Sequence, residues 1–261
     1  MASVHKPAVA GLFYPAEPET LRTQIASFLA NAPAAAAVPK AIIAPHAGYV
    51  YSGAIAASAY ARLKPARGTI RRVVLLGPSH RVAFHGLAAP SADAIETPLG
   101  QIPVDRAALQ QLADLPQFVI NDPAHAREHS LEVHLPFLQE VLGEFSLVPL
   151  AVGDATPVEV AEVLERLWGG PETLIVVSSD LSHYHDYDTA RKLDRVTSNA
   201  IEQLRYQDLD FDSACGRVPV SGLLYLAQRR GLTAETIDLR NSGDTAGPRD
   251  RVVGYGAYVF R

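Results

Sequence analysis

Three short apolar runs in this sequence each end abruptly in polar, ionisable residues. The runs are followed by residues 44–49 (APHAGY), 77–80 (GPSH) and 178–183 (SSDLSH), which supply His46, Ser79, His80, Asp180 and His183. Histidine imidazoles combined with a carboxylate form the ligand set that non-haem iron(II) prefers, and zinc accepts the same donors. Residue types alone therefore indicate a metal site without selecting the metal.

The apolar runs themselves indicate strands. Residues 41–44, 73–76 and 174–177 are continuously apolar, which is typical of strands buried on both faces. Helical patterns alternate with them, as in the capping-box sequence that opens at Thr156 with Glu159 three residues later. The expected helices cover residues 18–31, 52–64, 130–142, 156–168, 188–206 and 220–230, and further strands cover 118–120, 147–152, 234–240 and 252–260.

This alternation predicts the fold class. We expect an α/β protein whose residues 1–261 form a single-domain, three-layer αβα sandwich with a mostly parallel central sheet. Residues 86–104 are expected as an inserted β excursion. Ligands of such sheets bind outside the carboxyl ends of the strands. The side chains that follow the three apolar runs are therefore predicted to be neighbours in space.

The third metal ligand is open between two carboxylates. Asp244 lies in residues 241–245 (NSGDT), after the expected penultimate strand, and Asp180 is the alternative. Glycine at position 243 favours a tight loop there, although a solvated turn explains the same residues. We take Asp244 as the expected ligand beside the two histidines.

A fourth polar cluster occupies residues 128–134 (EHSLEVH). On a helix, His129 and Glu132 are three residues apart and can share a face, whereas His134 points elsewhere. The spacing does not match the H-E-x-x-H motif of zinc proteases. His129 and Glu132 are therefore candidates for supporting groups or substrate contacts, and a charged helix start capped by Glu128 or Ser130 is the alternative.

Cys215, the only cysteine, precedes the helix that is expected from residue 220. A helix N-terminus favours a thiolate, so a reactive thiol is one interpretation and a buried structural cysteine is the commoner one. A single cysteine forms no intramolecular disulfide, which fits a reducing compartment and excludes a Cys-rich zinc site.

Charge and composition exclude several classes of function. The 261 residues carry 23 Lys and Arg against 28 Asp and Glu, a net charge of −5, and no nucleic-acid partner is expected. No window approaches the about 20 apolar residues of a membrane span, and no signal-peptide pattern is present, so a soluble cytoplasmic protein is expected. The Ala-rich residues 30–38 are expected as a surface connector. P-loop, GxGxxG and GxSxG motifs are missing, which argues against nucleotide binding and serine hydrolysis.

The ordered set of motifs resembles the Memo family, which includes the bacterial and archaeal AmmeMemoRadiSam system protein B. The resemblance rests on residues 11–15 (GLFYP), 44–49, 77–80, 128–132 (EHSLE), 178–183 and 215–217 (CGR), which span the chain. It implies a fold similar to the LigB-type class III extradiol dioxygenases, with one α/β domain and the site at the strand ends. It also implies a functional link to a radical SAM protein and an AMMECR1-like protein.

By this resemblance, His46 and His80 correspond to metal-binding histidines, and Asp180 and His183 correspond to polar groups of the same pocket. Some family members place a cysteine in the loop after the penultimate strand, a position at which this chain has none. Asp244 is the expected replacement there.

These observations favour a non-haem iron(II) oxygenase that acts on a small aromatic diol or phenol, with zinc and copper as the other metals considered. In this hypothesis His183 exchanges protons with the substrate hydroxyl, Asp180 orients His183, and Tyr49 donates a hydrogen bond. Ser79 and Cys215 are expected in the same pocket. Two alternatives stay open: a protein that binds partner peptides through a vestigial pocket, and a zinc metallohydrolase.

Overall fold

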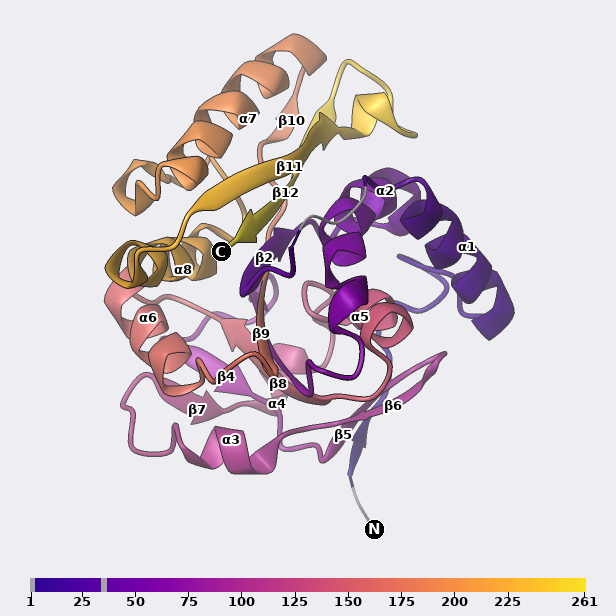
Figure 1. Ribbon diagram of the computed structural model, residues 1–261. Coiled ribbons are helices and arrows are strands. Elements are labelled where there is room, and N and C mark those ends of the chain that lie inside the picture. Colours follow the sequence, from indigo (N-terminus) through magenta and orange to yellow (C-terminus); the bar gives the residue numbers. More distant parts are fainter. Residues whose placement is uncertain (1–2, 34–36) are drawn as a thin grey trace.

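The structure, a computed structural model, describes residues 3–33 and 37–261 (Figure 1). The predicted connector at residues 30–38 includes residues 34–36, which lie outside the described residues. A large mixed sheet runs through the molecule, with helices on both faces. The predicted three-layer α/β architecture is therefore confirmed.

Four strands at the centre of the sheet are parallel, in the order β2 (Ala41–Ala44), β9 (Thr173–Ser178), β3 (Arg72–Pro78) and β8 (Ser146–Val152). Almost every residue in these strands is buried, because helices cover both faces. Their registers align the carboxyl ends, with Ala44 opposite Ser178. The segments that carry His46, His80 and Asp180 therefore leave the sheet along one edge.

Antiparallel strands extend this parallel centre on both sides. β12 (Val252–Phe260) runs antiparallel to β2 and also pairs with β10 (His183–His185) and β11 (Ala234–Asn241). On the other side, β4 (Leu87–Ala89) is antiparallel to β8 and parallel to β7 (Phe118–Ile120). The sheet is thus parallel at its centre and mixed toward its edges, since a short connection such as 242–251 joins antiparallel neighbours.

Six helices form the two outer layers (Figure 1). One face carries α1 (Pro18–Ala30), α2 (Tyr49–Tyr60) and α5 (Leu135–Leu142), and the other carries α6 (Pro157–Arg166), α7 (Tyr187–Glu202) and α8 (Arg217–Arg230). The predicted capping box is present at α6, where the Thr156 side chain accepts from Glu159 N and the Glu159 carboxylate accepts from Thr156 N. None of the helices in the described part of the chain is long and apolar enough to cross a membrane.

The predicted excursion at residues 86–104 divides between two sheets. β4 joins the main sheet, whereas β5 (Ala94–Thr97) and β6 (Gly100–Pro103) form a small three-stranded sheet with β1 (Val4–His5). Short helices α3 (Arg106–Gln110) and α4 (Asp122–His125) follow.

Two predicted helix starts differ from the structure near the carboxyl edge. The helix expected from residue 130 begins at Leu135, because residues Glu132–His134 form a turn of 3-10 helix before it. The helix expected from residue 220 begins at Arg217, directly after Gly216. This earlier start of α8 brings Cys215 to the end of the sheet.

Candidate metal centre

A cavity of about 480 Å³ lies at the carboxyl ends of the central strands. Loops after β2, β3 and β9 supply His46, His80 and Asp180, and β10 supplies His183. The full lining is His46, His80, His129, Asp180, His183, Tyr184, His185, Phe211, Asp212 and Cys215. The topology thus brings together residues that are more than a hundred positions apart in the sequence.

Three side chains in this cavity present potential metal ligands to one another. One donor atom each of His46, His80 and Cys215 lies within 4.8 Å of the other two. The Sγ atom of Cys215 is 3.3 Å from Nε2 of His46. Two imidazoles and a thiol are a donor set for iron, copper or zinc. A second such group combines His80 with Glu128 and His129.

The hydrogen bonds around His46 fix which ring nitrogen is free. Its Nδ1 is 2.6 Å from the hydroxyl of Ser178, and that hydroxyl donates its own proton to the carbonyl of Ser130 at 2.6 Å. The hydroxyl oxygen must therefore accept a proton from Nδ1. Burial lowers the pKa of His46 well below its usual value, so the ring is neutral. Its Nε2 lone pair then faces Cys215.

A buried glutamate orients His80 in the same way. Glu128 accepts from His80 Nδ1 at 2.9 Å and from His80 N at 2.6 Å, and also from the backbone nitrogens of His129 and Ser130. Burial alone would raise the pKa of Glu128, but these hydrogen bonds from His80 and the backbone lower it to about 2. A histidine that donates from Nδ1 to a carboxylate keeps Nε2 free to bind a metal. A carboxylate in this place is a usual hydrogen-bond partner of metal-bound histidines.

Sequence reasoning treated Glu128 only as a possible helix cap. The signal that could have identified it is its position directly before His129, at the start of the EHSLE motif. Ser178 is likewise expected from the sequence only as part of a polar segment. Its place at the end of β9, in register with Ala44 of β2, puts it within reach of the His46 ring.

Cys215 is half-buried, directly before the start of α8, and its Sγ lies near Asp180. Burial and the neighbouring Asp180 raise the pKa of its thiol well above the usual value. The predicted acidifying effect of the helix N-terminus is therefore outweighed, and the reactive-thiol interpretation does not fit this environment. A metal ion supplies the positive charge that favours the thiolate, so the residues fit a metal-thiolate site.

Asp180, His183 and His129 complete the polar lining. Asp180 is buried, which raises its pKa, and its Oδ1 accepts from His46 N at 2.8 Å. His183 Nδ1 is 2.8 Å from the carbonyl of Leu181, so that nitrogen carries the proton and Nε2 is free. The ring of His129 stacks on the ring of His80 with centroids 4.8 Å apart.

The expected ligand Asp244 lies elsewhere. It accepts from the hydroxyl of Tyr187 at 2.5 Å and from Asn241 N at 3.0 Å, and it lines a different pocket. Neither the cavity lining nor the groups of potential metal ligands among the described residues include it. The structure therefore does not bring Asp244 to the two histidines, although the sequence predicts this, and Cys215 is the residue that offers a third potential donor atom beside them.

Three other predicted site residues do not line the cavity. Tyr49 is buried and donates to the carbonyl of Val133 at 2.7 Å, so its hydroxyl is already used. Glu132 accepts from Tyr14 and two backbone nitrogens of the N-terminal segment. Ser79 donates to a nearby backbone carbonyl at 2.7 Å. These residues support the loops around the site and do not face a substrate.

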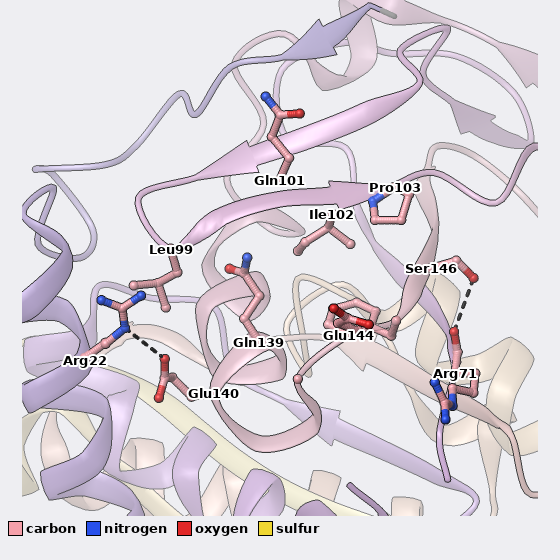
Figure 2. A pocket seen from close by; sticks show the side chains of 12 residues that line it. Arg22, Arg71, Leu99, Gln101, Ile102, Pro103, Gln139, Glu140, Glu144 and Ser146 are labelled. Atoms are coloured by element: carbon pink, nitrogen blue, oxygen red, sulfur yellow. Dashed lines mark hydrogen bonds and ion pairs between the residues drawn. The ribbon is translucent and has the colours of Figure 1, made fainter. Parts of the chain in front are cut away.

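A second pocket, of about 640 Å³, lies at the opposite, amino ends of β3 and β8 (Figure 2). Arg22 and Glu140 form an ion pair of 3.5 Å in it, and Ser146 donates to the carbonyl of Arg71 at 3.3 Å. None of its lining residues belongs to a group of potential metal ligands in the described ranges.

Comparison with known proteins identifies the relatives of the chain. Residues 5–259 match the family described as Memo-like protein. A MEMO1 family protein of Aquifex aeolicus is 38% identical, with 98% of this chain and 99% of that protein covered. MEMO1 family proteins of Saccharolobus solfataricus and Methanopyrus kandleri are 34% and 36% identical, covering 97% and 98% of this chain and 98% of each relative.

A solved structure supports the fold at lower sequence similarity. The crystal structure of an uncharacterized protein from Escherichia coli K12 superimposes with a TM-score of 0.54 at 12% identity. The match covers 84% of this chain and 98% of that one. At this identity the likeness concerns the fold alone. The family match over nearly the full length, together with the motifs that build the carboxyl-edge cavity, shows that the chain belongs to the Memo-like protein family.

Proposed function

We propose that His46, His80 and Cys215 bind a transition-metal ion and that the cavity around them is the active site of an oxidoreductase. Iron(II) is the proposed metal, and small phenols or catechols are the proposed substrates. The observation that carries this proposal is the convergence of three ligand atoms within 4.8 Å, with both histidines oriented by hydrogen bonds to Nδ1. Such oriented imidazoles are typical of metal ligands.

A bound iron(II) ion supplies Lewis acidity that favours a phenolate and a redox couple suited to dioxygen. Three protein ligands leave coordination positions open for substrate. The cavity volume of about 480 Å³ falls in the range of small-molecule sites. Phe211 and Tyr184 offer aromatic surface to a substrate ring.

His183 is the proposed proton acceptor for the substrate hydroxyl. Its proton is held on Nδ1 by the carbonyl of Leu181, which leaves Nε2 to accept a hydrogen bond in the cavity. His129 is a second neutral base, because burial lowers its pKa. Asp180 accepts a hydrogen bond from the backbone nitrogen of His46, and its charge partly offsets the effect of burial on the pKa of His129.

Metal content measured by mass spectrometry on anaerobically purified protein tests the proposal. The wild type is expected to hold near-stoichiometric iron, and the double variant His46→Ala, His80→Ala is expected to hold almost none. A matched double variant, His5→Ala and His85→Ala, removes two histidines that do not line the cavity and is expected to keep its metal. Oxygen uptake with catechols then tests the activity of the iron-loaded wild type.

The result also separates the competing functions. Zinc in place of iron would favour a metallohydrolase that uses the same ligands and His183 as its acid. Metal that persists in the His46→Ala, His80→Ala variant would contradict the assigned ligands. Absence of metal from every protein, even after iron(II) is supplied, would remove the oxidoreductase proposal and favour a protein that binds a partner through this pocket.

A further inference from the structure

We infer that the cavity recognises aromatic substrates that carry an acidic group, and that Arg217 and Arg251 bind that group. This inference rests on the proposed function, because it takes the cavity as the substrate site. Arg217 belongs to the first turn of α8 and Arg251 directly precedes β12. Each arginine lies against an aromatic side chain of the cavity wall, Phe211 and Tyr184 respectively.

The stacking of these arginines leaves their hydrogen-bond donors free. Cζ of Arg217 is 3.8 Å from the centroid of Phe211, and Cζ of Arg251 is 4.5 Å from the centroid of Tyr184. A guanidinium that lies over a ring directs its in-plane N–H groups outward, away from the ring. Neither guanidinium has a carboxylate or carbonyl partner among residues 3–33 and 37–261. Both are therefore held in place with donors available for an oxyanion.

The two aromatic side chains are unusually exposed for their size. Phe211 is 83% and Tyr184 is 62% exposed, although both line the cavity that contains His46, which is buried. Tyr184 also adopts a φ of 65°, a left-handed conformation that is unfavourable for a bulky residue. A conformation of this kind is commonly retained where it positions a functional side chain. A planar ring bound in the cavity would cover the exposed faces.

Charged side chains of both signs surround the cavity mouth. Asp212 lines the cavity, and Asp186 and Asp210 adjoin its lining residues His185 and Phe211 in the sequence. Arg217 and Arg251 are the cationic groups that lie over its two exposed rings. An anionic group of a ligand that covers these rings would meet them.

Calorimetric titration with three probes tests the inference without requiring turnover. The probes are 4-hydroxybenzoate, its neutral isostere 4-hydroxybenzamide, and cyclohexanecarboxylate, an anion without an aromatic ring. Purified wild-type protein is expected to bind 4-hydroxybenzoate at least about tenfold more tightly than either of the others, as one charge-assisted hydrogen bond predicts. Arg251→Gln and Arg217→Gln are each expected to remove about that factor for 4-hydroxybenzoate and to leave 4-hydroxybenzamide unchanged.

Two further variants separate recognition from structural damage. Arg191→Gln is the matched control, because Arg191 also lies over a tyrosine ring but lines a different pocket, and it is expected to bind all three probes like the wild type. Arg251→Lys keeps the charge without the planar stack and is expected to recover part of the lost affinity. Three results would each overturn the inference. They are equal affinity for the acid and the amide, affinity for 4-hydroxybenzoate that neither arginine substitution changes, and no measurable binding of 4-hydroxybenzoate.

The same titrations distinguish this inference from the proposed function. Discrimination between acid and amide in a protein that binds no metal would support the inference and contradict the oxidoreductase. Metal binding and phenol turnover without such discrimination would support the oxidoreductase and contradict the inference.

Discussion

The two ends of the central strands carry pockets of comparable size and opposite character. The carboxyl-end cavity measures about 480 Å³ and the amino-end pocket about 640 Å³. At the carboxyl end, His46 is 2% and Glu128 is 4% exposed. At the amino end, the side chains of the Arg22–Glu140 pair are 44% and 31% exposed (Figure 2). Volume therefore does not distinguish the candidate metal site from a surface depression.

The difference lies in how the ionisable groups are satisfied. At the carboxyl end specific hydrogen bonds to Ser178 and Glu128 fix the ring orientations of His46 and His80, respectively. At the amino end, opposite charges meet in water, where an ion pair contributes about 0–1 kcal/mol. Buried, oriented donors indicate chemistry, whereas exposed pairs indicate an ordinary surface.

The largest expected effect is the loss of metal on removal of the third ligand at the carboxyl end. Cys215→Ala is expected to reduce metal content to a small fraction of the wild type, because only two protein ligands remain. Asp244→Ala is the control and is expected to keep full metal content, since Asp244 is bonded to Tyr187. Mass spectrometry of both variants checks this, and metal loss in Asp244→Ala with retention in Cys215→Ala would reverse the corrected assignment.

A smaller loss is expected when the carboxylate behind His80 is neutralised. Glu128→Gln replaces one carboxylate oxygen with an amide nitrogen. His80 N, His80 Nδ1 and Ser130 N all donate to this carboxylate, so at least one of them then faces another hydrogen-bond donor. Metal affinity is expected to fall about 10- to 100-fold, as for other groups that orient ligands. The same change at the amino end, Glu140→Gln, is expected to leave affinity unchanged in a competitive chelator titration. Equal affinities in both variants would refute the role of Glu128.

Acidic residues at the two ends are expected to affect stability with opposite dependence on pH. Near the carboxyl end, burial raises the pKa of Asp194 to about 6, although its carboxylate accepts from Ser182 N. Near the amino end, burial acts in the same direction on Asp105, but hydrogen bonds from Ala108 N and Arg72 lower its pKa below the usual value.

The sign for Asp194 follows from its raised pKa. Below about pH 4 the group is protonated in both the folded and the unfolded state, and above about pH 6 its ionisation costs the folded state about 3 kcal/mol. The free energy of unfolding of the wild type is therefore expected to fall as pH rises from 4.5 to 8. In Asp194→Asn this fall is expected to be absent. Urea unfolding at both pH values measures it. A variant that keeps the wild-type pH dependence would contradict this account.

The smallest effect is expected at the amino-end pocket. Arg22→Ala removes an exposed ion pair with Glu140, and the free energy of unfolding is expected to change by less than about 1 kcal/mol. Metal content is expected to stay at the wild-type level. A change in metal binding would show that the two ends of the sheet are coupled, which would weaken the contrast between them.

The sequence alone determined the strands of the parallel centre and the edge at which the site forms. The runs 41–44, 73–76 and 174–177 are apolar throughout because both faces of those strands are covered, and the chain can turn polar only where each strand leaves the sheet. From that pattern and the rule for parallel sheets, the proximity of His46, His80 and Asp180 followed.

Only the tertiary structure placed Cys215, the proposed third ligand, beside His46. Cys215 is 169 residues from His46, and no local pattern relates the two. Gly216 lets the start of α8 approach β9, since a Cβ at that position would lie 2.6 Å from Cβ of Ser179. Asp244, by contrast, is held away by Tyr187 and Asn241. Local periodicity in the sequence determines the secondary-structure elements and where they end. Which loop lies over the cavity depends on close packing between segments that are distant in the sequence, and residue spacing does not reveal this packing.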